Sequence, residues 1–294
     1  MKSIYRNEQS KKAVWQLYDR QMDDLKVSYA DLFVDTSFGK THIIECGNLG
    51  GKPLLVFHGG NATTAYNLKY CGFLLDDFHV YAVDTIGHPG KSAEVSLSPR
   101  NQDYGKWAVD VIKGLGFNEM ACFGGSFGAG ILVKAMCVAP EVIKCSVLIV
   151  PSAIQNAPTY KSVSMAFPML MYWLTHKEKW FIKCILPMAI KASNITEDIL
   201  ETARCSIDNA KIKAVMPKNE SCKNLCKYQK PVLVIAAEKD CLFPAKAVLL
   251  KAKKVWKQSE RYLLKDRGHI NELTNEEKKM IIDFLIDATL WALK

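Results

Sequence analysis

The serine at position 126 stands in a pattern suited to nucleophilic catalysis. It is the central residue of the pentapeptide GGSFG (residues 124–128), which matches the G-x-S-x-G motif. An apolar run (120–123) precedes the motif and a helix-forming stretch (131–135) follows it, which is the strand–turn–helix setting that the motif requires. So sharp a turn needs small flanking residues, and the helix N-terminus beneath the serine favours developing negative charge. We therefore predict that Ser126 is a nucleophile.

A serine hydroxyl is a poor nucleophile unless a base takes its proton. In enzymes built around this motif, the chain order is serine, then acid, then histidine. His269 is the only one of the six histidines that lies after residue 176, so it is the expected base. It follows a short apolar run (261–264), and Gly268 allows the chain to turn tightly and direct the imidazole toward Ser126.

The acid that orients this base should follow the preceding apolar run (232–236), where Glu238 and Asp240 are both candidates. We prefer Asp240, because it lies in a loop that leads into a helix opened by Pro244 and leaves room for one helix and one strand before His269. The expected role of the acid is to hold the imidazole tautomer and to stabilise the imidazolium.

An oxyanion hole is expected in the sequence HGGN (residues 58–61), directly after the apolar run 54–57. Glycines there let backbone N–H groups approach a tetrahedral oxyanion closely. We assign one donor to the N–H of Gly60 and the other to the N–H of Phe127, the residue after the nucleophile, with Asn61 as an alternative contributor. His58 precedes the nucleophile, and we interpret it as structural.

The elements that must position these residues follow from the apolar pattern. Short runs without polar alternation are separated by helical segments, which is typical of parallel strands buried on both faces. A hairpin of two strand-like runs (29–35 and 40–45) and an N-terminal helix (7–25) come before them. The expected parallel strands are 53–57, 79–83, 120–123, 146–150, 232–236 and 261–264, and the expected helices include 63–75, 101–115, 126–138 and 276–293.

The alternation breaks between residue 151 and about residue 228, where helical segments are rich in methionine and aromatic residues. We predict a core of residues 1–150 and 228–294 with a helical cap, 151–227, inserted into it. Core packing explains most of these side chains, but we expect Met165, Met169 and Trp173 to line a substrate pocket over the carboxyl ends of the strands. An alternative is that Lys177, Lys179 and Lys183 turn inward and select an acidic substrate.

Taken together, these motifs resemble the α/β-hydrolase superfamily. The resemblance rests on HGG (58–60), G-x-S-x-G (124–128), Asp240 with Pro244, and the dipeptide Gly268-His269, in that order. Two further runs, FGKTHII (38–44) and YAVDTIG (81–87), are similar to bacterial carboxylesterases of the Bacillus naproxen-esterase type. The resemblance implies an α/β-hydrolase fold with a mostly parallel central sheet flanked by helices, a helical cap insertion, and cleavage of carboxylic esters without a cofactor.

The sequence departs from this family at three points. The turn at residues 87–90 is one residue longer than the commonest form, Ala237 stands where the family often has glycine, and Asp240 stands where those esterases tend to have glutamate. The cap shows little match, so a substrate preference is not carried over.

Composition limits the remaining possibilities. The chain has 294 residues, 49% of them hydrophobic, and a formal charge of +9 without a dense basic run, so nucleic-acid binding is not expected. Residues 1–20 lack an apolar signal-peptide core, and the most apolar stretch (167–174) is too short to span a bilayer, which predicts a cytoplasmic protein without membrane insertion. The ten cysteines show no zinc spacing and are expected to be free thiols, so no metal is expected.

The leading functional hypothesis is hydrolysis of a small-molecule ester through an acyl-enzyme on Ser126. A serine nucleophile argues against dehalogenases and epoxide hydrolases of similar layout, which use aspartate. Thioesterase, amidase, peptidase and carbon–carbon bond hydrolase activities share the same three residues and stay open, as do the physiological substrate and the oligomeric state. A non-catalytic ligand-binding receptor is the alternative from a different class of protein.

Overall fold

A single mixed sheet organises the chain. In the computed structural model, which describes residues 3–158, 163–211 and 215–290, eight strands lie in the order β1-β2-β4-β3-β5-β6-β7-β8. β1 pairs antiparallel with β2, β2 pairs antiparallel with β4, and all other neighbours are parallel. The strands are β1 (Tyr29–Thr36), β2 (Gly39–Gly47), β3 (Lys52–Phe57), β4 (Phe78–Val83), β5 (Met120–Gly125), β6 (Ile143–Ile149), β7 (Val232–Ala237) and β8 (Ser259–Leu264).

The unalternated apolar runs of β3 to β7 become strands buried on both faces, as predicted. The run 261–264 is an exception: it becomes the edge strand β8, where Arg261 and Tyr262 are exposed because β8 pairs with a neighbour on one side only. In β3, Leu55 and Phe57 enter one hydrophobic core, whereas Leu54 and Val56 enter the other, because successive side chains point to opposite faces of a sheet. The edge strand β1 is mostly exposed, because one of its faces is directed toward solvent. The fold is therefore the three-layer α/β arrangement that the sequence predicts.

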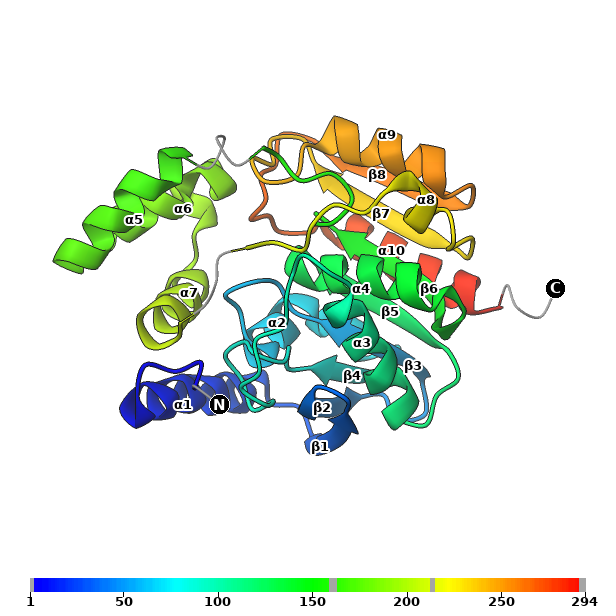
Figure 1. The fold of residues 1–294 in the computed structure, drawn as a ribbon, viewed down its shortest axis with the longest axis horizontal. Helices are drawn as coiled ribbons and strands as arrows, with labels where there is room; N and C mark the ends of the chain where they lie inside the picture. The colour runs from blue at the N-terminus through cyan, green and yellow to red at the C-terminus, as the bar shows by residue number, and fades with distance from the viewer. Residues whose placement is uncertain (1–2, 159–162, 212–214, 291–294) are drawn as a thin grey trace.

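Helices cover both faces of the sheet (Figure 1). One core lies under α3 (Asp103–Gly114), α4 (Phe127–Val138), α8 (Cys222–Leu225) and α9 (Ala245–Val255). The other lies under α1 (Glu8–Leu25), α2 (Thr64–Cys71) and α10 (Asn275–Leu290). The last residues of the predicted C-terminal helix, 291–293, lie outside the described residues. Short 3₁₀ helices are η1 (Gly72–Leu74), η2 (Pro140–Val142) and η4 (Ala192–Asn194).

Residues 151–227 contribute no strand to the described sheet. They form α5 (Val163–Thr175), α6 (Glu178–Ala189) and α7 (Glu197–Asn209), which pack around a separate small cluster that includes Tyr172, Phe181 and Leu200. Short α8 belongs elsewhere, because Leu225 is fully buried in the main core. The part of the segment that stands apart from the sheet therefore ends before α8 (Figure 1).

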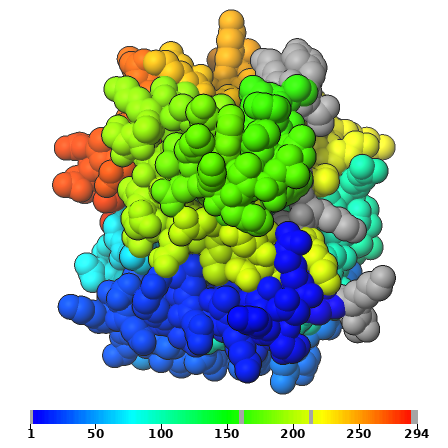
Figure 2. All heavy atoms as spheres, turned by 90° about the vertical axis from the view of Figure 1, so that its left-hand side faces the viewer, coloured from blue at the N-terminus to red at the C-terminus, as the bar shows by residue number. Residues whose placement is uncertain are grey.

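The N-terminal helix joins this helical segment to the rest of the molecule. Gln21 of α1 donates a hydrogen bond to Thr202 of α7 over 2.8 Å, and Arg20 forms an ion pair with Glu201. Tyr5 and Ala210 form an isolated antiparallel bridge. Figure 2 shows α1, in blue, directly below the yellow-green helical segment. Among the described residues, no helix combines the length and the apolar character needed to cross a membrane.

Candidate active site

Ser126 occupies a strained turn between β5 and α4. Its φ of 52° and ψ of −109° are unusual for a residue that is not glycine, and such strain persists where the surroundings enforce it. Small neighbours permit the turn: a Cβ at Gly128 would lie 2.5 Å from the carbonyl oxygen of Phe57. The N–H of Ser126 donates to the carbonyl of Ile149 over 2.8 Å, which ties the turn to β6.

The structure brings the three predicted chemical residues together. His269 Nε2 lies 2.9 Å from Ser126 Oγ, and His269 Nδ1 lies 2.8 Å from Asp240 Oδ2. A neutral imidazole that donates through Nδ1 to the carboxylate leaves Nε2 free to accept the serine proton. These residues are far apart in the sequence and come from three loops at the carboxyl ends of β5, β7 and β8.

Asp240 is held firmly. Its side chain is fully buried, and its second oxygen, Oδ1, accepts backbone N–H bonds from Leu242 over 2.7 Å and Phe243 over 3.0 Å. Glu238, the other candidate, accepts a hydrogen bond from the N–H of Asp266 and is solvent-exposed. The geometry therefore favours Asp240 as the partner of His269.

The loop that carries His269 packs against the end of α6. A Cβ at Gly268 would lie 2.3 Å from the carbonyl oxygen of Met188, and the N–H of Ile270 donates to that same oxygen over 3.0 Å. The need for glycine thus comes from this close approach, and Gly268 does not adopt a positive φ. The ring of Phe243 meets the His269 ring edge-on with centroids 5.2 Å apart.

The two loops predicted to supply oxyanion donors meet beside the serine. A Cβ at Gly59 would lie 3.7 Å from Ser126 Cβ, and a Cβ at Gly60 would lie 3.6 Å from Phe127 Cβ. The adjacent Asn61 adopts a positive φ of 58°. The backbone of Gly60 and Phe127 is therefore close enough to Ser126 for both N–H groups to serve one site.

His58 ties this loop to the neighbouring strand. Its Nδ1 donates to the carbonyl of Gly59 over 2.8 Å, and its Nε2 accepts the N–H of Thr85 over 3.1 Å. Burial lowers its pKa, which keeps the ring neutral. Both ring nitrogens are thus used by the backbone, in agreement with a structural role.

His88 is a residue that sequence reasoning did not single out. Its ring stacks at a tilt against Phe127 with centroids 4.6 Å apart and lies 6.0 Å from the ring of His58. Burial and the neighbouring His58 lower its pKa to about 3. The signal in the sequence was the turn at residues 87–90, which is one residue longer than usual and includes this histidine.

The cap residues predicted to bind substrate lie in different surroundings from one another. Met169 packs beside the cluster around Tyr172, and the carbonyl of Met165 accepts a bond from Cys184. Trp173 borders an outer hollow of about 530 Å³ together with Arg6, His176 and Asp208. The recorded contacts do not join any of the three to Ser126, so their substrate role stays a prediction.

Other apolar side chains approach the site more closely. Met216 would contact a Cβ at Gly60, and Ile190 would contact one at Gly268. Together with Phe243 against His269, they place apolar surface on several sides of the three polar residues. Met188, Ile190 and Met216 belong to the 151–227 segment, which indicates that the C-terminal end of α6 and the stretch before α8, more than α5, come close to the chemistry.

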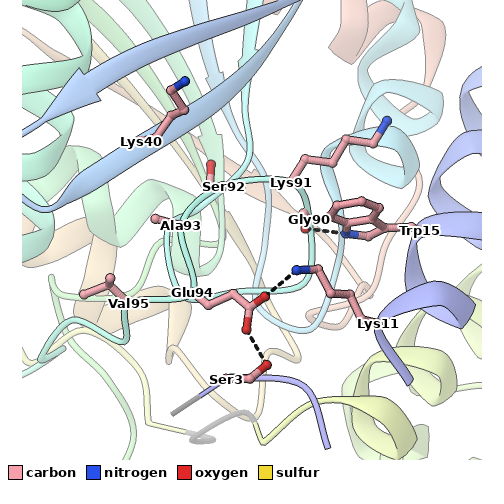
Figure 3. A pocket seen from close by; sticks show the side chains of 10 residues that line it. All are labelled: Ser3, Lys11, Trp15, Lys40, Gly90, Lys91, Ser92, Ala93, Glu94 and Val95. Atoms are coloured by element: carbon pink, nitrogen blue, oxygen red, sulfur yellow. Dashed lines mark hydrogen bonds and ion pairs between the residues drawn. The ribbon is translucent and has the colours of Figure 1, made fainter. Parts of the chain in front are cut away.

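A second hollow of about 480 Å³ lies between α1 and the loop after β4 (Figure 3). Lys11 forms an ion pair with Glu94 over 2.8 Å, Ser3 bonds to the same carboxylate, and the indole N–H of Trp15 donates to the carbonyl of Gly90. Among the described residues that line the hollow, no nucleophile is paired with a base. Its contacts hold the N-terminal segment on the core.

Among the described residues, no three His, Cys, Asp or Glu side chains gather as a metal site would require. All ten cysteines are free, and six of them are buried.

Comparison with known proteins agrees with this geometry. Residues 52–189 match the family model of the α/β-hydrolase fold. The Bacillus subtilis carboxylesterase YbfK is 31% identical over 138 residues, an alignment that spans only 47% of each chain, and the B. subtilis protein named uncharacterized carboxylesterase nap is 22% identical over 87% of this chain and 86% of its own.

Solved structures extend the likeness over the whole chain. The B. subtilis carboxylesterase CesB (YbfK) superposes with a TM-score of 0.79 at 22% identity, covering 95% of this chain and 99% of its own. The B. subtilis naproxen esterase gives a TM-score of 0.78 at 19% identity, covering 94% and 96%. The chain has the α/β-hydrolase fold, and it resembles these Bacillus carboxylesterases in sequence and structure.

Proposed function

We propose that this protein is a cofactor-independent serine hydrolase that cleaves carboxylic esters through an acyl-enzyme on Ser126. One observation carries the proposal: His269 lies within 2.9 Å of Ser126 Oγ through one ring nitrogen and within 2.8 Å of Asp240 through the other. A serine and a base arranged in this way are the signature of an activated nucleophile. The names of the relatives, carboxylesterases of B. subtilis, support an ester as the substrate.

Each residue of the site has a distinct role in the proposed reaction. Ser126 Oγ attacks the acyl carbon while His269 Nε2 takes its proton, and the resulting oxyanion accepts hydrogen bonds from the N–H groups of Gly60 and Phe127. The imidazolium, stabilised by Asp240, then gives the proton to the leaving alcohol. Water repeats the sequence on the acyl-enzyme, with His269 as base, and frees the acid.

The substrate we propose is a small ester with an apolar acyl or aryl part. The side chains of Met216, Ile190 and Phe243 near the site are apolar, whereas Lys177, Lys179 and Lys183 are solvent-exposed, which disfavours the alternative of an acidic substrate held by inward-turned lysines. Each methylene buried in the pocket is worth up to about 0.8 kcal/mol, or nearly fourfold in kcat/KM, until the pocket is full.

A fluorophosphonate probe tests the proposal directly. The wild type should be labelled on Ser126 and Ser126→Ala should not, because only an activated serine reacts. A binding-only protein would remain unlabelled. Measuring kcat/KM for p-nitrophenyl acetate, butyrate, hexanoate and a succinate half-ester then tests the apolar preference, and a preference for the half-ester would contradict it. Activity should also survive EDTA.

A cytoplasmic location is the companion proposal. Ten free thiols, six of them buried, suit a reducing compartment, because disulfides form and persist mainly in oxidising ones. Fractionation of cells that produce the protein would test the location.

A further inference from the structure

Helix α5 has an apolar surface that no other part of the described chain covers. All thirteen of its residues are uncharged, and the structure buries only Tyr172 among them. A helix that is apolar all round is normally buried on every side. One side of α5 does pack on α6, through the cluster around Tyr172 and Phe181, but the opposite side does not.

The uncovered side forms a continuous stripe, which we call the apolar stripe. Its members are 49% to 69% exposed and recur at helical spacing, so they lie along one face; they are Val163, Phe167, Leu170, Trp173 and Leu174. In Figure 1 α5 is the helix farthest from the sheet, and in Figure 2 its green atoms face the viewer. A concentration of large apolar side chains of this kind marks an interaction surface.

The charges beside the apolar stripe are mainly positive. Residues 163–191 contain four lysines and one acidic residue, Glu178, which forms an ion pair with Arg204. Lys183 Nζ lies 4.7 Å and Lys179 Nζ 5.8 Å from the centroid of the Trp180 ring. Phe167 of the stripe meets that same ring edge-on at 5.9 Å, so the lysines border the stripe directly.

Of the four acidic side chains of α7, two are paired with cations, whereas Glu197 and Asp208 have no ion-pair partner among the described residues. In α7, Asp198 pairs with Lys69 and Glu201 pairs with Arg20, both on the side of the core. Asp208 accepts a hydrogen bond from the hydroxyl of Tyr172. The outer face of α5 and α6 therefore combines apolar and aromatic side chains with the exposed lysines Lys177, Lys179 and Lys183.

We propose that this face docks on an anionic phospholipid surface, with α5 lying in the plane of the interface. Helices that bind in this way place aromatic and aliphatic residues among the acyl chains and lysines at the headgroups. Aromatic rings and lysines also suit the headgroup level, where one end of the side chain is apolar and the other wet. With thirteen residues, α5 is too short to cross the bilayer, which needs about 20.

Vesicle flotation with Ser126→Ala tests the proposal without lipid hydrolysis and independently of the proposed esterase activity. The protein should float with vesicles of equal parts phosphatidylglycerol and phosphatidylcholine, and less with phosphatidylcholine alone. Adding Leu170→Glu and Leu174→Glu should weaken binding at least about tenfold, since charges replace two apolar anchors. Leu250→Glu, at an exposed leucine of α9, is the matched control and should change binding less than twofold.

Variants of the lysines beside the apolar stripe provide a second test of the proposal. Lys179→Gln and Lys183→Gln should each weaken binding to the anionic vesicles about fivefold and leave binding to neutral vesicles unchanged. In the wild-type sequence, hydrogen exchange of residues 163–175 should slow when anionic vesicles are added, a measurement that needs no variant. Folding of the glutamate variant is checked by its kcat/KM for p-nitrophenyl butyrate in the Ser126 background.

Three outcomes would overturn the proposal. The first is failure of the protein to float with anionic vesicles at low ionic strength. The second is an equal loss of binding in Leu250→Glu and in the stripe variant. The third is a wild-type dimer, measured by light scattering, that the stripe variant converts to monomer, because a second copy of the chain would then cover the apolar stripe.

Discussion

The site around Ser126 and the helical segment α5–α7 differ in how much of their apolar surface is buried. Around Ser126, three strands of the central sheet hold three loops so that His269 meets Ser126 and Asp240 within 2.9 Å. In α5, by contrast, five large apolar side chains are about half exposed or more. One chain can therefore carry a closely bonded chemical centre on a sheet and an exposed apolar surface on the segment inserted into it.

The junction between the two regions is strongly bonded. Lys251 Nζ donates to the carbonyls of Ile154 and Glu220, which lie at opposite ends of the inserted segment, over 2.7 and 2.9 Å. The N–H of Glu220 also donates to the carbonyl of Ala153. The segment therefore leaves and rejoins the core at one place, so changes to its outer helices should leave the site largely intact.

The largest expected effect comes from the site itself. Ser126→Ala should lower turnover of p-nitrophenyl butyrate roughly 10⁶-fold, because the nucleophile is removed from a group of residues that act as a unit. The folded structure should persist, as judged by circular dichroism. Turnover close to that of the wild type in the purified variant would refute the assignment of the whole site.

The second-largest effect is expected from Asp240, the acid that orients His269. Asp240→Asn should lower kcat roughly 10⁴-fold, by analogy with the serine-protease aspartate, since the neutral amide no longer holds the correct tautomer of His269. Glu238→Gln is the matched control and should cost little, because Glu238 bonds only to the N–H of Asp266 among the recorded contacts. If the glutamine variant is the inactive one, the choice of Asp240 is wrong.

The ion pair at the junction should matter for stability. Lys134 of the nucleophile helix and Glu220 are both almost fully buried and bonded to each other. Lys134→Met should lower the free energy of unfolding by about 3–5 kcal/mol, because it leaves a buried carboxylate unpaired. The exposed pair Lys279–Asp283 offers the control: Lys279→Met should cost less than about 1 kcal/mol in urea denaturation. Equal losses would mean that the buried pair has no special role.

Low pH should lower the free energy of unfolding through His88. Burial and His58 lower its pKa to about 3, below the value of about 6.5 in the unfolded chain, so the unfolded state binds more protons as the pH falls between these values. Stability present above pH 6.5 is thus lost on acidification, by up to about 2 kcal/mol at pH 5. Urea midpoints at pH 7.5 and 5 should differ less in His88→Gln than in the wild type, and an unchanged difference would contradict the prediction.

The smallest effect is expected on the outer face of the inserted segment. Leu170→Ser should change the free energy of unfolding by no more than about 0.5 kcal/mol, because the leucine is half-exposed at the surface. Phe181→Ala, on the buried side of the same segment, should cost about 3–5 kcal/mol. A large loss in Leu170→Ser, measured by thermal unfolding, would mean that the apolar stripe is packed in solution and would remove the contrast between the two regions.

Sequence alone determined the parts of this protein whose signals are local. The strand–turn–helix setting of GGSFG, the chain order of serine, acid and histidine, and the unalternated apolar runs each depend on residues within a short window, and the observed strands follow those runs to within a few residues. Ser126, Asp240 and His269 could be named for that reason.

Only the tertiary structure decided what depends on distant segments meeting. Asp240, and not Glu238, hydrogen-bonds to His269, which lies 29 residues further along the chain. The carbonyl of Met188 approaches Gly268 so closely that only glycine fits there, and the ring of His88 packs against Phe127. The tertiary structure also turned Trp173 to the outer surface. The physical reason is that α5 is apolar all round, so its periodicity cannot specify which side packs; that choice belongs to α6 and its neighbours.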